Sequence, residues 1–270
     1  MVNWKDFRYA FSVYTPKSIF FNIGSIISSD VVVVSFQKCG KTWLRLMLSN
    51  ILQEKFNIKK VKLNLQEMTW FTKAPNILIS HGGSTKDNNK IKFENVFRKK
   101  KIILLCRDPR DIVVSLFHGS RTRDKVYDGA NISEFMRDPA CGFPKIVSFM
   151  NLWANEYKKR PQDFITVKYE DLKNDTKKEL EKITTFIGVD ASDDLLSRTV
   201  EYGSFQNMRK MEMEGKINDY RMKPGNKNDP NSFRTRKGKV GGYKDELSQE
   251  DQDYIDNQVK ENLDLFYGYQ

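Results

Sequence analysis

The stretch that decides the fold is VVVVSFQKCGKTWLRL, residues 31–46. Residues 31–35 (VVVVS) form a continuous apolar run, which is typical of a strand buried on both faces. From Lys41 onward apolar residues recur at helical spacing: Leu44, Met47, Leu48, Ile51 and Leu52. Because Gly40 joins the two patterns, the sequence predicts a strand that turns directly into a helix. The backbone N–H groups and the positive helix end at such a turn bind phosphate or sulfate.

Three more short apolar runs, at residues 76–80, 101–106 and 164–168, are predicted to be strands. Helical patterns separate or follow them. Pro109 suits a first helical turn, and residues 248–265 are predicted to form a final helix. Strands that alternate with helices indicate βαβ units, so the expected fold is α/β, with a central parallel sheet flanked by helices.

Some local signals set the expected ends of these elements. A capping box is predicted to begin a helix at Thr176, and Gly188 is predicted to end it. Two regions interrupt the alternation. Residues 82–95 are polar and predicted to be a loop, and residues 209–235, which lack periodicity, are predicted to be a mobile lid or a loop.

Length and composition limit the class of protein. The 270 residues suffice for one domain with a sizeable core, and we expect residues 1–270 to form a single domain. Apolar residues make up 39% of the chain, and no window approaches the roughly 18 apolar residues that a membrane helix needs. The N-terminus lacks the apolar region of a signal peptide, so the expected location is cytoplasmic, with no membrane partner.

Charge and reactive residues narrow the partners. The net charge of +11 is compatible with a nucleic acid, an anionic membrane surface or an anionic small ligand as partner, and also with a merely solvated basic surface. The absence of zinc-finger or RNP patterns argues against a nucleic-acid partner. Three scattered cysteines support neither a disulfide framework nor a zinc site, and only two histidines occur. We therefore expect no metal site.

The loop of residues 35–42 leaves several functions open. Gly40, Lys41 and Thr42 match the end of the ATP-binding Walker A pattern, but Ser35 replaces its first glycine, and Lys38 is not required by that pattern. A P-loop kinase of a small molecule therefore remains an alternative. A basic protein that binds nucleotides or polyanions without catalysis is a third possibility.

The same loop resembles that of a different family. Residues 35–43 (SFQKCGKTW) are similar to the phosphosulfate loop T-Y-P-K-S-G-T-T-W of cytosolic-type sulfotransferases, with Gln37, Cys39 and Lys41 as departures. These enzymes use 3′-phosphoadenosine 5′-phosphosulfate (PAPS) as sulfuryl donor and release adenosine 3′,5′-bisphosphate (PAP). The resemblance implies the P-loop NTPase-like sulfotransferase fold.

Further motifs extend the resemblance over most of the chain. Residues 107–115 (RDPRDIVVS) are similar to the family's 3′-phosphate motif R-N/D-P-K/R-D-x-x-V-S. Residues 236–244 (RKGKVGGYK) resemble R-K-G-x-x-G-D-W-K, with Gly242 and Tyr243 in place of Asp-Trp. Tyr169 matches the family's Y-E-D-L segment. Phe205 matches its T-S-F-Q-x-M segment, in which glycine replaces the threonine.

By this resemblance the donor site is assigned residue by residue. Lys41 and Thr42 would bind the 5′-phosphate, Arg107 and Ser115 the 3′-phosphate, and aromatic residues the adenine. The implied PAPS-binding set is Lys38, Cys39, Gly40, Lys41, Thr42, Trp43, Arg107, Ser115, Tyr169, Phe205, Arg236, Lys237 and Gly238.

The chemistry of sulfuryl transfer needs a base and a stabilised leaving group. Ser80-His81 resembles the family's Ser/Thr-His-x-Pro segment, which carries the general base, and a neutral histidine can accept a proton at cellular pH. Lys38 is predicted to stabilise charge on the leaving phosphate. By the resemblance, the reaction needs no magnesium. The second histidine, His118, is expected to cap or pack its helix and not to act as the base.

The acceptor and the assembly are less defined. The segments expected to line the acceptor pocket, around residues 82–95, 119–145 and 209–235, contain many polar and charged residues. They favour a small, polar acceptor hydroxyl or amine over a steroid. The family's dimer signature K-x-x-x-T-V-x-x-x-E is altered from Lys244 to Asp253, so a monomer or a weak homodimer is expected.

Overall fold

The computed structural model describes residues 24–81, 97, 99–122 and 131–270. Its centre is a parallel sheet of four strands in the order β2-β1-β3-β4. The strands are β1 (Val31–Val34), β2 (Ile77–Ser80), β3 (Lys101–Cys106) and β4 (Phe164–Lys168). The predicted strands and the predicted parallel sheet are therefore confirmed.

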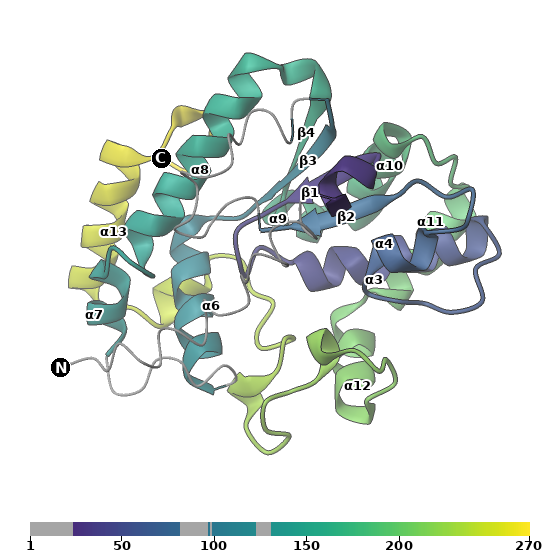
Figure 1. The fold of residues 1–270 in the computed structure, drawn as a ribbon. Helices are drawn as coiled ribbons and strands as arrows, with labels where there is room; N and C mark the ends of the chain where they lie inside the picture. Colours follow the sequence, from purple (N-terminus) through teal and green to yellow (C-terminus); the bar gives the residue numbers. More distant parts are fainter. Residues whose placement is uncertain (1–23, 82–96, 98, 123–130) are drawn as a thin grey trace.

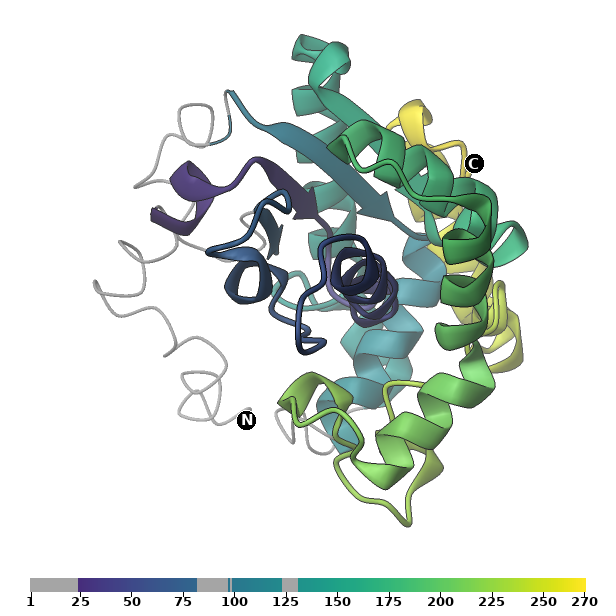
Figure 2. The same cartoon turned by 90° about the vertical axis from the view of Figure 1, so that its right-hand side faces the viewer.

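Helices cover both faces of the sheet, as the fully apolar strand β1 requires (Figures 1 and 2). On one side lie α6 (Pro109–Thr122), α7 (Ile132–Arg137), α8 (Phe143–Lys159) and α13 (Gln249–Asn262). On the other side lie α3 (Lys41–Lys55), α10 (Thr176–Ile187) and α11 (Asp193–Tyr202). Three further helices follow β1 or β4 in the chain: α4 (Leu65–Thr69), α9 (Tyr169–Asn174) and α12 (Phe205–Glu214). No helix in the described ranges is both long and apolar enough to cross a bilayer.

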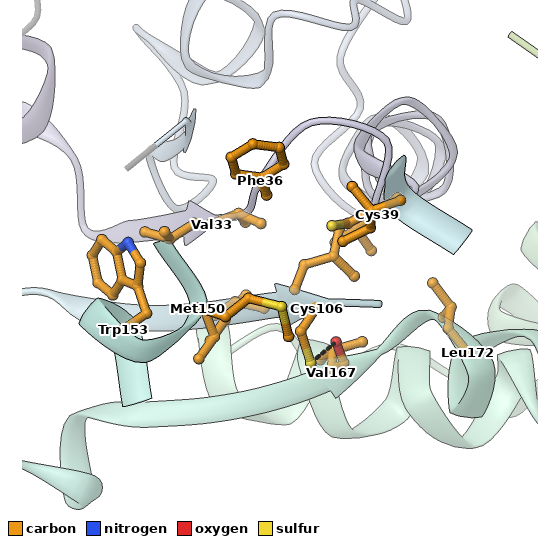
Figure 3. Packing of buried hydrophobic residues seen from close by; sticks show 14 of the residues in the cluster. Val33, Phe36, Cys39, Cys106, Met150, Trp153, Val167 and Leu172 are labelled. Carbon is orange, nitrogen blue, oxygen red and sulfur yellow. Dashed lines mark hydrogen bonds between the residues drawn. The ribbon is translucent and has the colours of Figure 1, made fainter. Parts of the chain in front are cut away.

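The hydrophobic core joins the sheet to both helical layers. All four valines of β1 are buried, and Trp153 of α8 is fully buried against Phe149 and Phe164. Figure 3 shows this part of the core, with Val33, Phe36 and Trp153 packed between β1 and α8. This packing holds the carboxyl ends of the strands in place, where the loops that carry the motifs begin.

Helix α10 begins one residue away from the predicted cap. Asp175, not Thr176, is the N-cap residue, and its carboxylate accepts a hydrogen bond from the backbone N–H of Lys178. The Thr176 hydroxyl is engaged elsewhere, because it donates to the carbonyl oxygen of Leu172 at 2.8 Å. The predicted stop is confirmed, since Gly188 has the left-handed backbone (φ 75°) that suits glycine.

Part of the predicted lid or loop is helical. Helix α12 extends to Glu214 and therefore includes the first residues of the segment 209–235. Two short 3₁₀ turns follow, η2 (Tyr220–Met222) and η3 (Pro230–Ser232). The predicted loop at residues 82–95 lies outside the described residues.

Candidate active site

The carboxyl ends of all four strands deliver predicted site residues to one edge of the sheet. Lys38 lies in the loop after β1, His81 follows β2, Arg107 follows β3 and Tyr169 follows β4. These residues line a single cavity of about 380 Å³. All but one of the predicted site residues line it: Lys38, Gly40, Lys41, Thr42, Trp43, His81, Arg107, Ser115, Tyr169, Phe205, Arg236, Lys237 and Gly238.

The loop after β1 has the backbone of an anion-binding turn. Lys38 and Gly40 both have positive φ angles, 67° and 93°. A side chain at Gly40 would also place its Cβ 2.8 Å from the ring of Tyr169, so only glycine fits there. Helix α3 begins at Lys41, and the first N–H groups of a helix have no partner within the helix. The turn can therefore donate backbone hydrogen bonds to a phosphate or sulfate.

Cys39 is the predicted site residue that does not reach the cavity. Its side chain is buried in the core, where Figure 3 shows it among apolar residues that include Val33 and Cys106. Burial raises the pKa of the Cys39 thiol to about 11, so it stays protonated. Only the backbone of this residue could contact a bound anion.

Lys41 and His81 form a close pair inside the cavity. Lys41 Nζ lies 2.6 Å from His81 Nδ1 and donates a second hydrogen bond to the carbonyl oxygen of Ser35 at 3.1 Å. The nearby Lys41 charge, followed by loss of water around the ring, holds the pKa of His81 well below its usual value. Burial and the charge of Arg45 likewise lower the pKa of Lys41. Since an ammonium group only donates, the contact requires an unprotonated Nδ1.

Arg107 connects three parts of the site. Its guanidinium donates to the carbonyl oxygens of Lys38 (3.3 Å) and Lys239 (2.9 Å) and pairs with Asp111 at 3.2 Å. It also lies 4.4 Å from the centre of the Tyr169 ring. Its buried Nε has no hydrogen-bond partner among the described residues. A buried donor of this kind at the wall of a basic cavity suits an anionic ligand.

Asp111 is a structural member of the site that the sequence reasoning did not single out. This buried carboxylate accepts hydrogen bonds from Arg107 and from the backbone N–H groups of Gly241 (2.9 Å) and Tyr243 (3.1 Å). It thereby fixes the third motif, residues 236–244, against the second motif, residues 107–115. The i, i+4 spacing of Arg107, just before α6, and Asp111, in its first turn, was the available sequence signal.

Glu246 is a second residue that the sequence reasoning missed. Arg236 (2.8 Å) and Lys237 (2.9 Å) both pair with its carboxylate, and His118 contacts it as well. Burial would raise the pKa of Glu246, but hydrogen bonds from Lys237 and Arg236 lower it to about 2. The two cations of the third motif are therefore shared with a carboxylate that is ionised at neutral pH. Arg236 and Lys237 lie ten and nine residues before Glu246, whereas His118 comes from the distant helix α6.

Aromatic residues form one wall of the cavity. The Trp43 indole donates to the carbonyl oxygen of Gly203 at 2.7 Å and meets the Tyr169 ring edge-on, with centroids 5.8 Å apart. A Cβ at Gly203 would lie 2.7 Å from the Met47 side chain, so a larger residue there would require Met47 to shift. Gly238 has φ 59°, and the Phe205 ring lies where a Cβ at this position would be, so glycine lets the ring pack against the backbone.

These features fit a nucleotide that carries phosphate groups. The turn after β1 supplies backbone donors, Arg107 has a buried donor without a partner among the described residues, and Trp43, Tyr169 and Phe205 offer aromatic surface for a base. Within the described ranges, no group of three His, Cys, Asp or Glu side chains is arranged to hold a metal ion.

Comparisons with known proteins agree with this geometry. The model of the sulfotransferase domain family matches residues 28–267. The amine sulfotransferase of Oryctolagus cuniculus is 25% identical, with 89% of this chain and 83% of that protein covered. Sulfotransferase 6B1 of Mus musculus is 26% identical over 87% of this chain and 77% of its own length.

Solved structures share the fold. Mouse sulfotransferase SULT7A1, solved in complex with PAP, superposes with a TM-score of 0.63 at 20% identity and covers 89% of this chain and 88% of its own. Retinol dehydratase in complex with androsterone and inactive cofactor PAP gives a TM-score of 0.60 at 18% identity, with 86% and 80% covered. The chain has the P-loop NTPase-like fold of these structures.

Proposed function

The chain belongs to the sulfotransferase domain family, and we propose that it moves the sulfuryl group of PAPS to a hydroxyl or amine of a small molecule. The observation that carries this proposal is the convergence of all four strand ends on one cavity, which brings Lys38, His81 and Arg107 together. The relatives named above are sulfotransferases, and both solved neighbours contain PAP.

Each wall of the cavity has a role in holding the donor. Lys41, Thr42 and the N–H groups of the turn bind the 5′-phosphate. The 3′-phosphate binds to Arg107 and Ser115 and to two cations of the third motif, Arg236 and Lys237. These two cations pair with Glu246 in the structure, and part of that contact gives way to the phosphate. Trp43, Tyr169 and Phe205 provide the adenine site.

Proton transfer and charge stabilisation are assigned to His81 and Lys38. When bound, PAPS supplies sulfur for a new bond to the acceptor oxygen or nitrogen, while the bond from sulfur to the bridging oxygen breaks and its electron pair leaves on the phosphate. His81 takes the proton that the acceptor loses. Lys38 places its ammonium at the bridging oxygen and stabilises the charge that develops there.

The Lys41–His81 contact links donor binding to the base. In the described structure Lys41 Nζ lies within hydrogen-bond distance of His81 Nδ1, at 2.6 Å. When Lys41 turns toward the 5′-phosphate, this nitrogen becomes available to the acceptor. We therefore expect the donor to bind before the acceptor is deprotonated.

Labelled PAPS and ligand-induced thermal stabilisation test the function. We expect PAP without magnesium to raise the melting temperature, since a ligand at 100 times its Kd stabilises by about 2.7 kcal/mol. Arg107→Gln should weaken this effect. His81→Ala should lower the rate of sulfate transfer by about 10²–10⁴-fold while PAP still binds.

The alternatives give different results in the same assays. Stabilisation by Mg-ATP and not by PAP would favour the small-molecule kinase. PAP binding with no sulfate transferred to any phenol, alcohol or amine, and no effect of His81→Ala, would favour a non-catalytic binding protein. Lys210→Met, at an exposed position on α12, serves as the control for a lost surface charge.

A further inference from the structure

Three arginines line the part of the cavity next to His81 and have no role in the proposed donor site: Arg45, Arg221 and Arg234. Arg45, on α3, donates to the carbonyl oxygen of Ile79 at 3.3 Å, two residues before His81. Burial and then the charge of Arg221 lower the pKa of Arg45 to about 10. The charges of all three arginines also act on His81. The three guanidinium groups therefore form one cluster beside the proposed base.

The segment after α12 holds two of these arginines in position. Arg221 pairs with Asp219 at 2.9 Å, and the adjacent Met222 is fully buried in a small core with Leu46 and Met208. Figures 1 and 2 show this yellow-green segment running from α12 past α3 toward α6. The segment predicted as a lid or loop therefore contributes a packed wall of the cavity.

A buried carboxylate fixes the backbone at Arg234. Glu212 of α12 has no exposed surface and accepts hydrogen bonds from the N–H groups of Arg234 (2.6 Å) and Thr235 (3.1 Å). The Thr235 hydroxyl donates to the same carboxylate at 2.8 Å. A guanidinium mounted on such a fixed backbone is suited to bind a ligand group in a defined orientation.

The charge of the cavity exceeds what the donor requires. Among the described residues, ten lysines and arginines line the cavity, and Asp111 is the one carboxylate among them. Three carboxylates outside the lining, Asp219, Asp245 and Glu246, pair with some of these cations and leave the cavity with a positive excess. A phosphate monoester carries about −1.5 to −2 charges at neutral pH, and the phosphosulfate adds roughly two more. The positive charges of Lys38, Arg107 and the third motif lie where they can neutralise the negative charge of the donor. The arginine cluster beside His81 remains for a different anion.

We propose that the acceptor carries its own anionic group, a carboxylate, phosphate or sulfate, which binds to Arg45, Arg221 and Arg234 while His81 deprotonates the neighbouring hydroxyl or amine. This inference rests on the proposed function. Guanidinium groups bind carboxylates and phosphates through paired hydrogen bonds, so the cluster both selects a charged acceptor and orients it toward the sulfur.

The test compares matched acceptors on the PAP-saturated protein. The probes are 4-hydroxybenzoate, its neutral methyl ester and 4-hydroxyphenyl phosphate, with binding measured by calorimetry. We expect at least one anionic probe to bind about ten-fold more tightly than the ester, as expected for hydrogen bonds to charged groups. The anion that binds more tightly identifies whether the cluster prefers a carboxylate or a phosphate acceptor. Arg221→Gln and Arg234→Gln should each remove most of this preference, and Arg221→Lys should retain part of it.

Controls separate this inference from the proposed function. Arg198→Gln, an exposed surface arginine paired with Glu54 and Asp194, should leave the preference unchanged. Equal binding of acids and ester to the PAP-saturated wild type, or a preference that survives both glutamine variants, would overturn the anionic acceptor. Failure of the wild type to bind PAP, or to sulfate any acceptor including neutral ones, would instead overturn the proposed function.

Discussion

At position 41 this chain has lysine where the resembling loops have threonine, and the structure places its ammonium 2.6 Å from His81. The substitution adds a buried basic group next to the proposed base, and burial lowers the pKa of this group as well. The immediate consequence is electrostatic, because a nearby cation disfavours the protonated imidazole. His81 therefore stays neutral at a lower pH than an isolated histidine would.

We predict that His81 titrates below its ordinary pKa of about 6.5 and that Lys41→Met moves its titration upward. Because the chain has only two histidines, NMR can follow both ring signals, with His118→Gln used to assign them. Lys210→Met, which removes an exposed charge, should not move the His81 midpoint. A midpoint at or above 6.5 in the wild type, or one that Lys41→Met leaves in place, would contradict the electrostatic role of Lys41.

At the scale of single elements, side-chain caps and glycines set the ends of the helices. Helix α10 ends at Gly188 as predicted, but it begins with Asp175 as its cap, because the Thr176 hydroxyl donates back to Leu172. Helix α3 begins at Lys41, and its N-cap residue Gly40, with positive φ, turns the chain from β1 into the helix. Such ends determine where the first N–H groups of a helix point, and therefore where anions bind.

We predict that Asp175→Ala lowers the free energy of unfolding by about 1 kcal/mol, within a range of about 0.5–2 kcal/mol, because the N–H of Lys178 loses its partner. Urea denaturation followed by circular dichroism measures this change. Thr176→Ala is the matched control, with a smaller expected effect. A larger loss from Thr176→Ala than from Asp175→Ala would show that the threonine is the effective cap.

At the scale of the whole molecule, one core supports a site assembled from distant segments. Trp153 of α8 is fully buried and packs against rings from neighbouring elements, with centroid distances of 5.5 Å to Phe97 and 6.3 Å to Phe164. Because the strands between the helical layers are short, this packing determines the position of their carboxyl ends. Stability and the geometry of the site therefore depend on the same contacts.

We predict that Trp153→Ala lowers the free energy of unfolding by about 3–5 kcal/mol, through lost burial and the cavity left behind. Trp153→Phe should cost less and allows the comparison if the alanine variant does not fold. Trp70→Ala is the control, since that tryptophan is 55% exposed and should change stability by about 0.5 kcal/mol or less. Similar losses for both tryptophan-to-alanine variants in urea titrations would contradict the assigned core.

The sequence by itself determined the elements and the motifs at their ends. Four valines and a glycine predicted strand β1 and its turn, and the segments of Arg107 and Arg236 indicated anion binding, because strand and helix periodicities and turn glycines act over a few residues. Only the tertiary structure decided which side chains meet. The Lys41–His81 contact and the His118–Glu246 contact join segments far apart in the chain, and the burial of Cys39 depends on the packed core. Such contacts depend on how helices pack against the sheet, and local patterns contain no information about that packing.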